Sequence, residues 1–264
     1  MPHMLILGMG YTAARLAARL RDGGWTVTGV RRSPGPDMLA FDDMPAIHAA
    51  IGQATHILSS VPPQGDDDPV LIRYGAAISA APARWTGYLS STGVYGDAAG
   101  AWVDENSPIG TGRRTARAQA DAAWGALRPD LRRFRLPGIY GPGRSALDRV
   151  REGRGHRIDL PDQLFSRVHV DDIVGGVIAA FDGPPGVYNL SDDLPCAQNR
   201  VIEAACDLLG LPWPPLQSLD EAGLSPMARG FYAENRRVAN GRAKRLLGWR
   251  PRYPTYADGL RACL

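Results

Sequence analysis

Short strand-like runs alternate with helix-like segments through the first 140 residues of the chain. The first run, at 4–7, is apolar and continuous, as expected for a strand buried on both faces of a parallel sheet. Further runs of this kind lie at 25–30, 56–60, 87–91 and 133–136. Apolar residues recur at helical spacing between them, at 12–20, 45–51, 70–80 and 114–127. The alternation predicts βαβ units and an α/β fold with a doubly wound parallel sheet.

The pattern becomes less regular after residue 141, where prolines are frequent. Strand-like runs remain at 166–168 and 187–190, and helical patterns at 170–181, 200–209 and 242–247. We expect Asp171 or Asp172 to cap the first of these helices and Asn240 to cap the last. We therefore expect a doubly wound domain at 1–165 and a smaller C-terminal lobe at 166–264, interleaved with the first rather than independent. About seven or eight strands in the order 3-2-1-4-5-6 are expected.

Composition limits the classes of function that fit the chain. Its 264 residues carry a net charge of only +3, far below that of a typical nucleic-acid-binding protein. The three cysteines show no metal-ligand or disulfide spacing, so we expect no metal site. The N-terminus lacks the basic region of a signal peptide, and no apolar run reaches the ~18 residues that span a bilayer. We expect a cytoplasmic monomer or homodimer with a small-molecule substrate and with neither nucleic acid nor a membrane as its partner.

A glycine-rich segment connects the first predicted strand to the first predicted helix. It follows a G-x-G-x-x-A pattern, formed by Gly8, Gly10 and Ala13, with Tyr11 and Thr12 between the last two. Gly8 allows a tight turn, Gly10 lets the backbone approach a pyrophosphate, and Ala13 permits close packing of helix on strand. The helix N-terminus would then bind the phosphates. The pattern in this context predicts a dinucleotide site, and a plain glycine-rich turn is the alternative.

The end of the second predicted strand indicates which dinucleotide is bound. A carboxylate there would select NAD by accepting a hydrogen bond from the ribose 2′-hydroxyl. The chain has Arg31, Arg32 and Ser33 at this place. Two guanidiniums and a hydroxyl suit the 2′-phosphate of NADP, because arginine forms bidentate, charge-assisted bonds with phosphate. NADP is therefore favoured over NAD, with a solvated basic loop as the alternative.

Four segments match the motifs of one family in the family's own order. They are LSSTGVYGD at 89–97, RLPGIYGPG at 135–143, RVHVDDI at 167–173 and VYNL at 187–190. Together they resemble the extended, epimerase/dehydratase-like branch of the short-chain dehydrogenases/reductases, and the match covers nearly the whole chain. The resemblance implies an NAD(P)-binding Rossmann domain with a substrate lobe.

The resemblance also implies a catalytic Ser or Thr, a Tyr, and a Lys four residues after the Tyr. Ser91 falls on the Ser/Thr position, but Thr115 and Gln119 occupy the Tyr and Lys positions. The single lysine, Lys244, has no tyrosine four residues before it. A phenol with a pKa near 10 is a poor base at neutral pH without a neighbouring cation. The standard acid–base pair is therefore absent, and Tyr95 is either a substitute phenol or a packing residue.

Several other residues are candidates for lining the cofactor and substrate sites. Ser60, Val61 and Pro62 follow the third predicted strand and should line the nicotinamide side of the site. Ser91, Pro62 and Tyr95 are expected to line the cleft between the two parts of the chain. His169 and Arg237 are candidates for substrate binding, although His169 could simply order the start of its helix and Arg237 could lie at the surface.

These observations favour an NAD(P)-binding enzyme of the epimerase/dehydratase type, NADP-preferring, with a non-standard active site and a small, sugar-like substrate. The alternative is a non-catalytic NADP-binding protein that senses the redox state.

Overall fold

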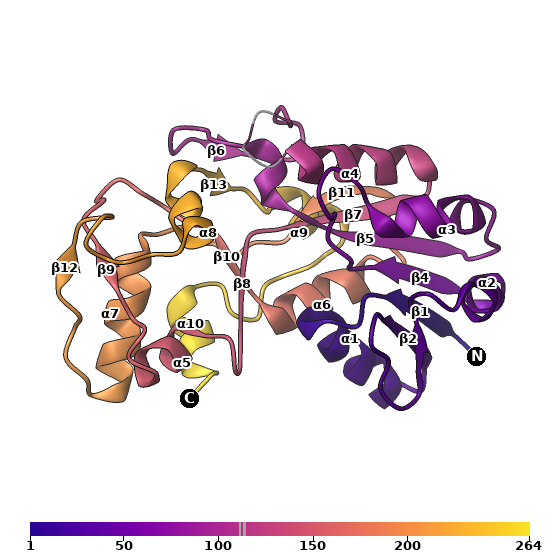
Figure 1. Cartoon of the computed structure of the whole chain (residues 1–264), viewed down its shortest axis with the longest axis horizontal. Coiled ribbons are helices and arrows are strands. Elements are labelled where there is room, and N and C mark those ends of the chain that lie inside the picture. Colours follow the sequence, from indigo (N-terminus) through magenta and orange to yellow (C-terminus); the bar gives the residue numbers. More distant parts are fainter. Residues whose placement is uncertain (111, 113–114) are drawn as a thin grey trace.

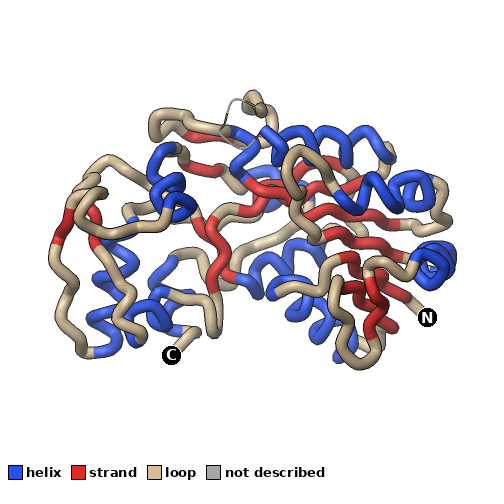
Figure 2. Tube along the Cα trace, viewed as in Figure 1, coloured by secondary structure: helices blue, strands red, loops and turns tan. Residues whose placement is uncertain are grey.

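The computed structural model describes residues 1–110, 112 and 115–264, and seven parallel strands form its central sheet (Figures 1 and 2). The strands lie side by side in the order β11-β7-β5-β4-β1-β2-β3. Their bounds are β1 (His3–Leu7), β2 (Thr26–Arg31), β3 (Met38–Ala40), β4 (His56–Ser59), β5 (Trp85–Ser91), β7 (Leu131–Leu136) and β11 (Gly186–Asn189). Numbered within the sheet, this order is the predicted 3-2-1-4-5-6 continued by a seventh strand, so the doubly wound Rossmann fold is confirmed.

Both faces of the sheet are covered by helices because side chains alternate along each strand. In β1, Met4 and Ile6 join the apolar core beneath α1 (Tyr11–Asp22) and α6 (Val170–Ala179). Leu5 and Leu7 join the core of the opposite face. The helices of that face are α2 (Met44–Gln53), α3 (Pro69–Ser79) and α4 (Thr115–Leu127).

A smaller lobe lies beyond the carboxyl end of the sheet, at the left of Figure 1. Its core is formed by three helices, α5 (Ala146–Arg151), α7 (Gln198–Leu209) and α10 (Tyr256–Arg261). Two short parallel strands, β9 (Arg157–Ile158) and β12 (Leu216–Gln217), lie beside α7. The remaining elements are η1 (Thr92–Tyr95), β6 (Trp102–Val103), β8 (Gly138–Tyr140), β10 (Arg167–His169), α8 (Pro226–Arg229), η2 (Gly230–Ala233), β13 (Arg237–Val238) and α9 (Gly241–Leu246).

The predicted elements are present, but two predicted caps are wrong. The cap of α6 is His169, whose Nδ1 accepts a hydrogen bond from the Asp171 backbone N–H, while Asp172 instead accepts from the backbone of the segment before α10. Asn240 does precede α9, but its side-chain amide donates to Ser191 and Asp193 rather than capping the helix. Asp171 and Asp172 lie within the first turn of α6, after its cap, whereas the Asn240 amide is used by tertiary partners. The pattern also missed β3, α5 and α10, and the predicted first residue of the helix at 114–127 lies outside the described residues.

The part of the chain after residue 165 is shared between the sheet and the lobe. Strand β11 pairs in parallel with β7, and α6 packs beside α1. No helix in the described residues combines the length and apolar character needed to cross a bilayer.

Candidate functional site

The glycine-rich turn lies at the carboxyl end of β1. Gly8 has a φ of 94°, and a Cβ there would lie 2.8 Å from Val61 Cγ2. Gly10 precedes α1, and a Cβ there would meet no atom within 4 Å. Ala13 is 1% exposed, and Thr12 is also buried. Gly8 therefore serves the packing of the turn, whereas Gly10 leaves open space at the N-terminus of a twelve-residue helix, where an anion can bind.

The end of β4 packs against this turn. The Ser60 N–H donates to Leu7 O at 2.9 Å, and the Ser60 hydroxyl donates to Gly8 O. Val61 lies against Gly8, since a Cβ at Gly8 would be 3.1 Å from the Val61 backbone nitrogen. Pro62 is exposed. Two of the three residues predicted to line the site are thus in direct contact with the glycine turn.

A second loop approaches the turn from the other side. The Tyr11 hydroxyl donates to Pro142 O at 3.0 Å, and the Arg144 guanidinium lies 5.7 Å from the centre of the Tyr11 ring. Tyr11 therefore connects the glycine turn with the Gly-Pro-Gly loop at 141–143.

Arg31 is the last residue of β2, and Arg32 and Ser33 follow it at the surface. All three are exposed, and neither guanidinium forms an ion pair with any described residue. Their charges are thus not compensated within the described residues, and they remain available to an anion beside the turn.

A cavity of about 390 Å³ lies between the carboxyl end of the sheet and the small lobe. Ser91, at the end of β5, contributes to its wall, and the Ser91 hydroxyl accepts a hydrogen bond from the Gly93 N–H at 3.1 Å. The opposite wall comes from the small lobe and from the chain before β13. It includes Arg149, His156, Phe165, Tyr232 and Arg236.

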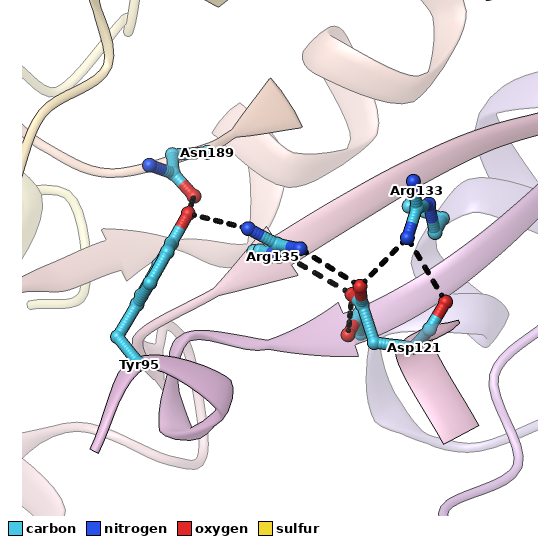
Figure 3. Close-up of polar contacts among 6 residues, drawn as sticks. Tyr95, Asp121, Arg133, Arg135 and Asn189 are labelled. Carbon is cyan, nitrogen blue, oxygen red and sulfur yellow. Dashed lines mark hydrogen bonds and ion pairs between the residues drawn. The ribbon is translucent and has the colours of Figure 1, made fainter. Parts of the chain in front are cut away.

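Tyr95 points into the protein rather than into this cavity (Figure 3). Its hydroxyl donates to Asn189 Oδ1 at 2.7 Å and accepts from Arg135 Nη1 at 3.0 Å. Arg135 in turn binds the buried carboxylate of Asp121, which also pairs with Arg133 at 2.9 Å. Burial raises the pKa of the Tyr95 phenol despite the nearby Arg135 charge. This arrangement indicates a structural phenol rather than a base.

Thr115 and Gln119 both lie on the exposed side of α4, and neither lines the cavity. His169 is 1% exposed, its ring contacts Tyr140 and Tyr253, and burial lowers its pKa. His169 orders the start of α6 and does not reach the cavity.

Arg237 donates to Gly100 O at 2.6 Å and is not a lining residue, whereas its neighbour Arg236 is. The side chain of this segment that faces the cavity is thus Arg236 and not the predicted Arg237. For His156 and Tyr232 no sequence signal was available, because each is an isolated residue in a loop-rich region and is distant from Ser91 along the chain.

Two proteins of known sequence resemble the chain. A 3-diazoavenalumate denitrifying reductase from a Streptomyces species is 34% identical over 137 residues, which span 46% of this chain and 43% of that protein. The chain therefore matches less than half the length of this relative. Protein YeeZ of Escherichia coli K12 is 24% identical over 287 residues, spanning 96% of this chain and 97% of YeeZ. No protein-family model matches the chain.

Several solved structures resemble the whole chain. A conserved protein of unknown function from Silicibacter pomeroyi is 43% identical, with a TM-score of 0.88 over 100% of this chain and 98% of that one. The human epimerase family protein SDR39U1, solved with NADPH, has a TM-score of 0.79 at 19% identity and 98% coverage of both chains. A UDP-glucuronic acid 4-epimerase from Bacillus cereus, solved with NAD, has a TM-score of 0.76 at 14% identity, covering 98% of this chain and 96% of that one. The last two likenesses concern the fold.

Proposed function

We propose that the chain is an atypical member of the extended short-chain dehydrogenase/reductase family, of the epimerase-like branch, that binds a nicotinamide dinucleotide and transfers hydride to or from a small substrate. The observation that carries the proposal is the glycine turn. Gly10 leaves open space at the N-terminus of α1, and the end of β4 forms the adjacent wall. Solved neighbours of this fold hold NADPH or NAD.

NADP is the favoured cofactor. Arg31 and Arg32 stand where a carboxylate would otherwise select NAD, and both are exposed beside the turn. Their guanidiniums can bind the 2′-phosphate of NADP, with Ser33 as a further donor. NAD has no such group, so it gains nothing from these side chains.

The cavity beside Ser91 is the proposed substrate site. Ser91 can donate a hydrogen bond to the substrate there, but Thr115 and Gln119 cannot replace a Tyr and Lys pair. An alcohol is much harder to ionise than a phenol, and an amide carries no charge. The proposed hydride transfer therefore depends on the proximity of cofactor and substrate and on Ser91, which suits a slow or unusual oxidoreductase or epimerase reaction. The name of the Streptomyces relative, a reductase, supports this class.

Calorimetric titration with NADPH and NADH tests the cofactor assignment. We expect NADPH to bind about 10- to 100-fold more tightly, since a charge-assisted hydrogen bond contributes roughly 1.5–3 kcal/mol. Arg31→Ala combined with Arg32→Ala should remove this preference, whereas Arg19→Ala, at an exposed position far from the turn, should keep it. Equal affinities of the wild-type protein for the two cofactors would refute the NADP assignment.

The missing Tyr and Lys also support a second candidate, a sensor of the NADP redox state without turnover. NADPH oxidation measured against sugar nucleotides and small carbonyl compounds distinguishes the two. Turnover that falls in Ser91→Ala supports the enzyme. Tight NADPH binding without turnover of any compound supports the sensor.

A further inference from the structure

The cavity carries an excess of positive charge. Among the described residues, four arginines line it, Arg144, Arg149, Arg167 and Arg236, against one carboxylate, Glu234. Glu234 is already paired with Arg236 at 2.9 Å. The other three guanidiniums form no ion pair with any described residue. The cavity therefore favours an anionic ligand.

Two of these arginines, Arg149 and Arg167, lie at the lobe end of the cavity. Arg149 belongs to α5. Burial lowers the pKa of His156, and the charge of Arg149 lowers that pKa further. Arg167 is 7% exposed, and its guanidinium donates only to neutral acceptors, among them Phe165 O at 2.9 Å and Gln198 Oε1 at 3.0 Å. Because α5 lies in the lobe and Ser91 ends a sheet strand, the anionic group and the reacting group of one ligand can occupy opposite ends of the cavity (Figure 1).

The walls between these ends are mainly aromatic and aliphatic. Phe165 and Tyr232 meet edge to face, with ring centres 5.4 Å apart, and further rings come from Tyr140, Phe231 and Tyr256. Aliphatic side chains complete these walls.

Several neutral polar groups in the wall are already engaged, whereas the Tyr140 hydroxyl has no hydrogen-bond partner among the described residues. Ser145 binds Asp148, the Ser166 hydroxyl accepts from the Val238 N–H, and Gln198 Oε1 accepts from Arg167. A polyhydroxylated sugar needs many such donors and acceptors, because each buried hydroxyl without a partner costs binding free energy. A flat apolar body needs none of them.

We propose that the substrate is a small aromatic carboxylate, with its carboxylate bound by Arg149 and its ring packed against Phe165 and Tyr232. The inference rests on the proposed function, because it names the substrate class of the same site. It replaces the sugar-like substrate expected from sequence, since the walls combine several aromatic rings with an excess of guanidiniums.

The test is calorimetric titration of the protein, with and without saturating NADPH, with trans-cinnamate as the probe. The matched neutral compound is cinnamamide, and UDP-glucose represents a sugar nucleotide. We expect cinnamate to bind about tenfold or more tightly than cinnamamide, the effect of one charge-assisted hydrogen bond. Comparable affinities for cinnamate and cinnamamide, no binding of cinnamate at millimolar concentration, or tighter binding of UDP-glucose would overturn the proposal.

Two arginine variants locate the contact. Arg149→Gln should abolish the preference for cinnamate over cinnamamide, and Arg149 is exposed, so the variant should fold with an unchanged melting temperature. Arg151→Gln, on the same helix but outside the cavity, is the control and should keep the preference. Loss of the preference in both variants, or in neither, contradicts the assignment of Arg149.

NADPH binding, measured in the same titrations, separates this proposal from the proposed function. If NADPH binds but cinnamate shows no preference over cinnamamide, only the substrate class is wrong. If NADPH does not bind, the proposed function fails, whatever cinnamate does.

Discussion

Asp192 is a carboxyl group that the fold buries without a side-chain partner. It is 2% exposed, and neither carboxyl oxygen has a hydrogen-bond partner among the described residues. Burial raises its pKa to about 7, more than the nearby Arg167 charge lowers it. The folded protein therefore holds this proton at pH values where the unfolded chain, with a carboxyl pKa of about 4, has lost it.

This pKa makes stability fall as the pH rises. Between about pH 4 and pH 7 the folded state binds more protons than the unfolded state, so the free energy of unfolding decreases with pH. We expect the free energy of unfolding, measured with urea, to decrease between pH 5 and pH 8. In Asp192→Asn this decrease should be smaller than in the wild type by on the order of 2–3 kcal/mol. Asp66→Asn, in an exposed loop, is the control. A wild-type profile that matches that of Asp192→Asn would show that the carboxyl group is already ionised at pH 5.

Tyr95 ends η1, which follows β5, and its hydrogen bond to Asn189 connects this segment to β11. Tyr95→Phe removes the hydroxyl partner of Asn189 Oδ1 and of Arg135 Nη1, while Arg135 keeps its ion pair with Asp121, and we expect the variant to reduce the free energy of unfolding by about 1–3 kcal/mol. NADPH affinity should change less than twofold. Chemical denaturation and NADPH titration check the two expectations. Unchanged stability together with lost turnover would instead identify Tyr95 as a catalytic residue.

At the scale of the elements, the β1–α1 connection combines two glycines with different roles. Gly8 needs its positive φ, and a Cβ there would contact Val61 at the end of β4. Gly10 has an ordinary negative φ of −87°, and its Cβ would meet only open space. We therefore expect Gly8 to matter for folding and Gly10 for cofactor binding.

Alanine substitutions should reveal this difference. Gly8→Ala should lower the melting temperature, because it strains the backbone and pushes β4 away. Gly10→Ala should fold normally but bind NADPH about tenfold or more weakly, because the methyl group occupies the space of the pyrophosphate. Gly52→Ala in α2, where the Cβ is also free, controls for the added methyl group. Normal NADPH affinity in Gly10→Ala would place the phosphates elsewhere.

At the scale of the whole molecule, the chain passes several times between the sheet and the lobe. After β8 it enters the lobe through α5, and it returns through α6 and β11 to complete the sheet. Ion pairing between Arg15 of α1 and Asp171 of α6, at 3.1 Å, also links the two parts of the sequence. Residues 1–165 alone lack one edge strand and one covering helix.

A fragment of residues 1–165 should therefore not fold independently. Its β7 edge would be unpaired and the apolar core beneath α6 would be exposed to water. We expect the fragment to aggregate or to unfold without a cooperative transition, while the full chain melts in a single transition by calorimetry. A soluble fragment that melts cooperatively would show that the sheet needs neither β11 nor α6.

The sequence by itself determined the doubly wound parallel sheet and the glycine turn, although it missed β3 at one edge of the sheet. Each depends on a local signal, such as an apolar run, a helical period or a glycine spacing, combined with the few topologies that parallel strands allow. Gly8, Gly10, Ser60 and Val61 could be placed together for this reason, since consecutive strand ends of a parallel sheet meet at one edge.

Only the tertiary structure decided the composition of the cavity and the direction of each side chain. Arg149, His156 and Tyr232 face Ser91 across the cavity, although they come from distant parts of the chain. Tyr95 turned inward because Asn189, 94 residues away, offers its hydroxyl a buried partner. Sequence periodicity carries no information on such partners, because a side chain takes its direction from packing between elements and from the buried hydrogen bonds it can form there.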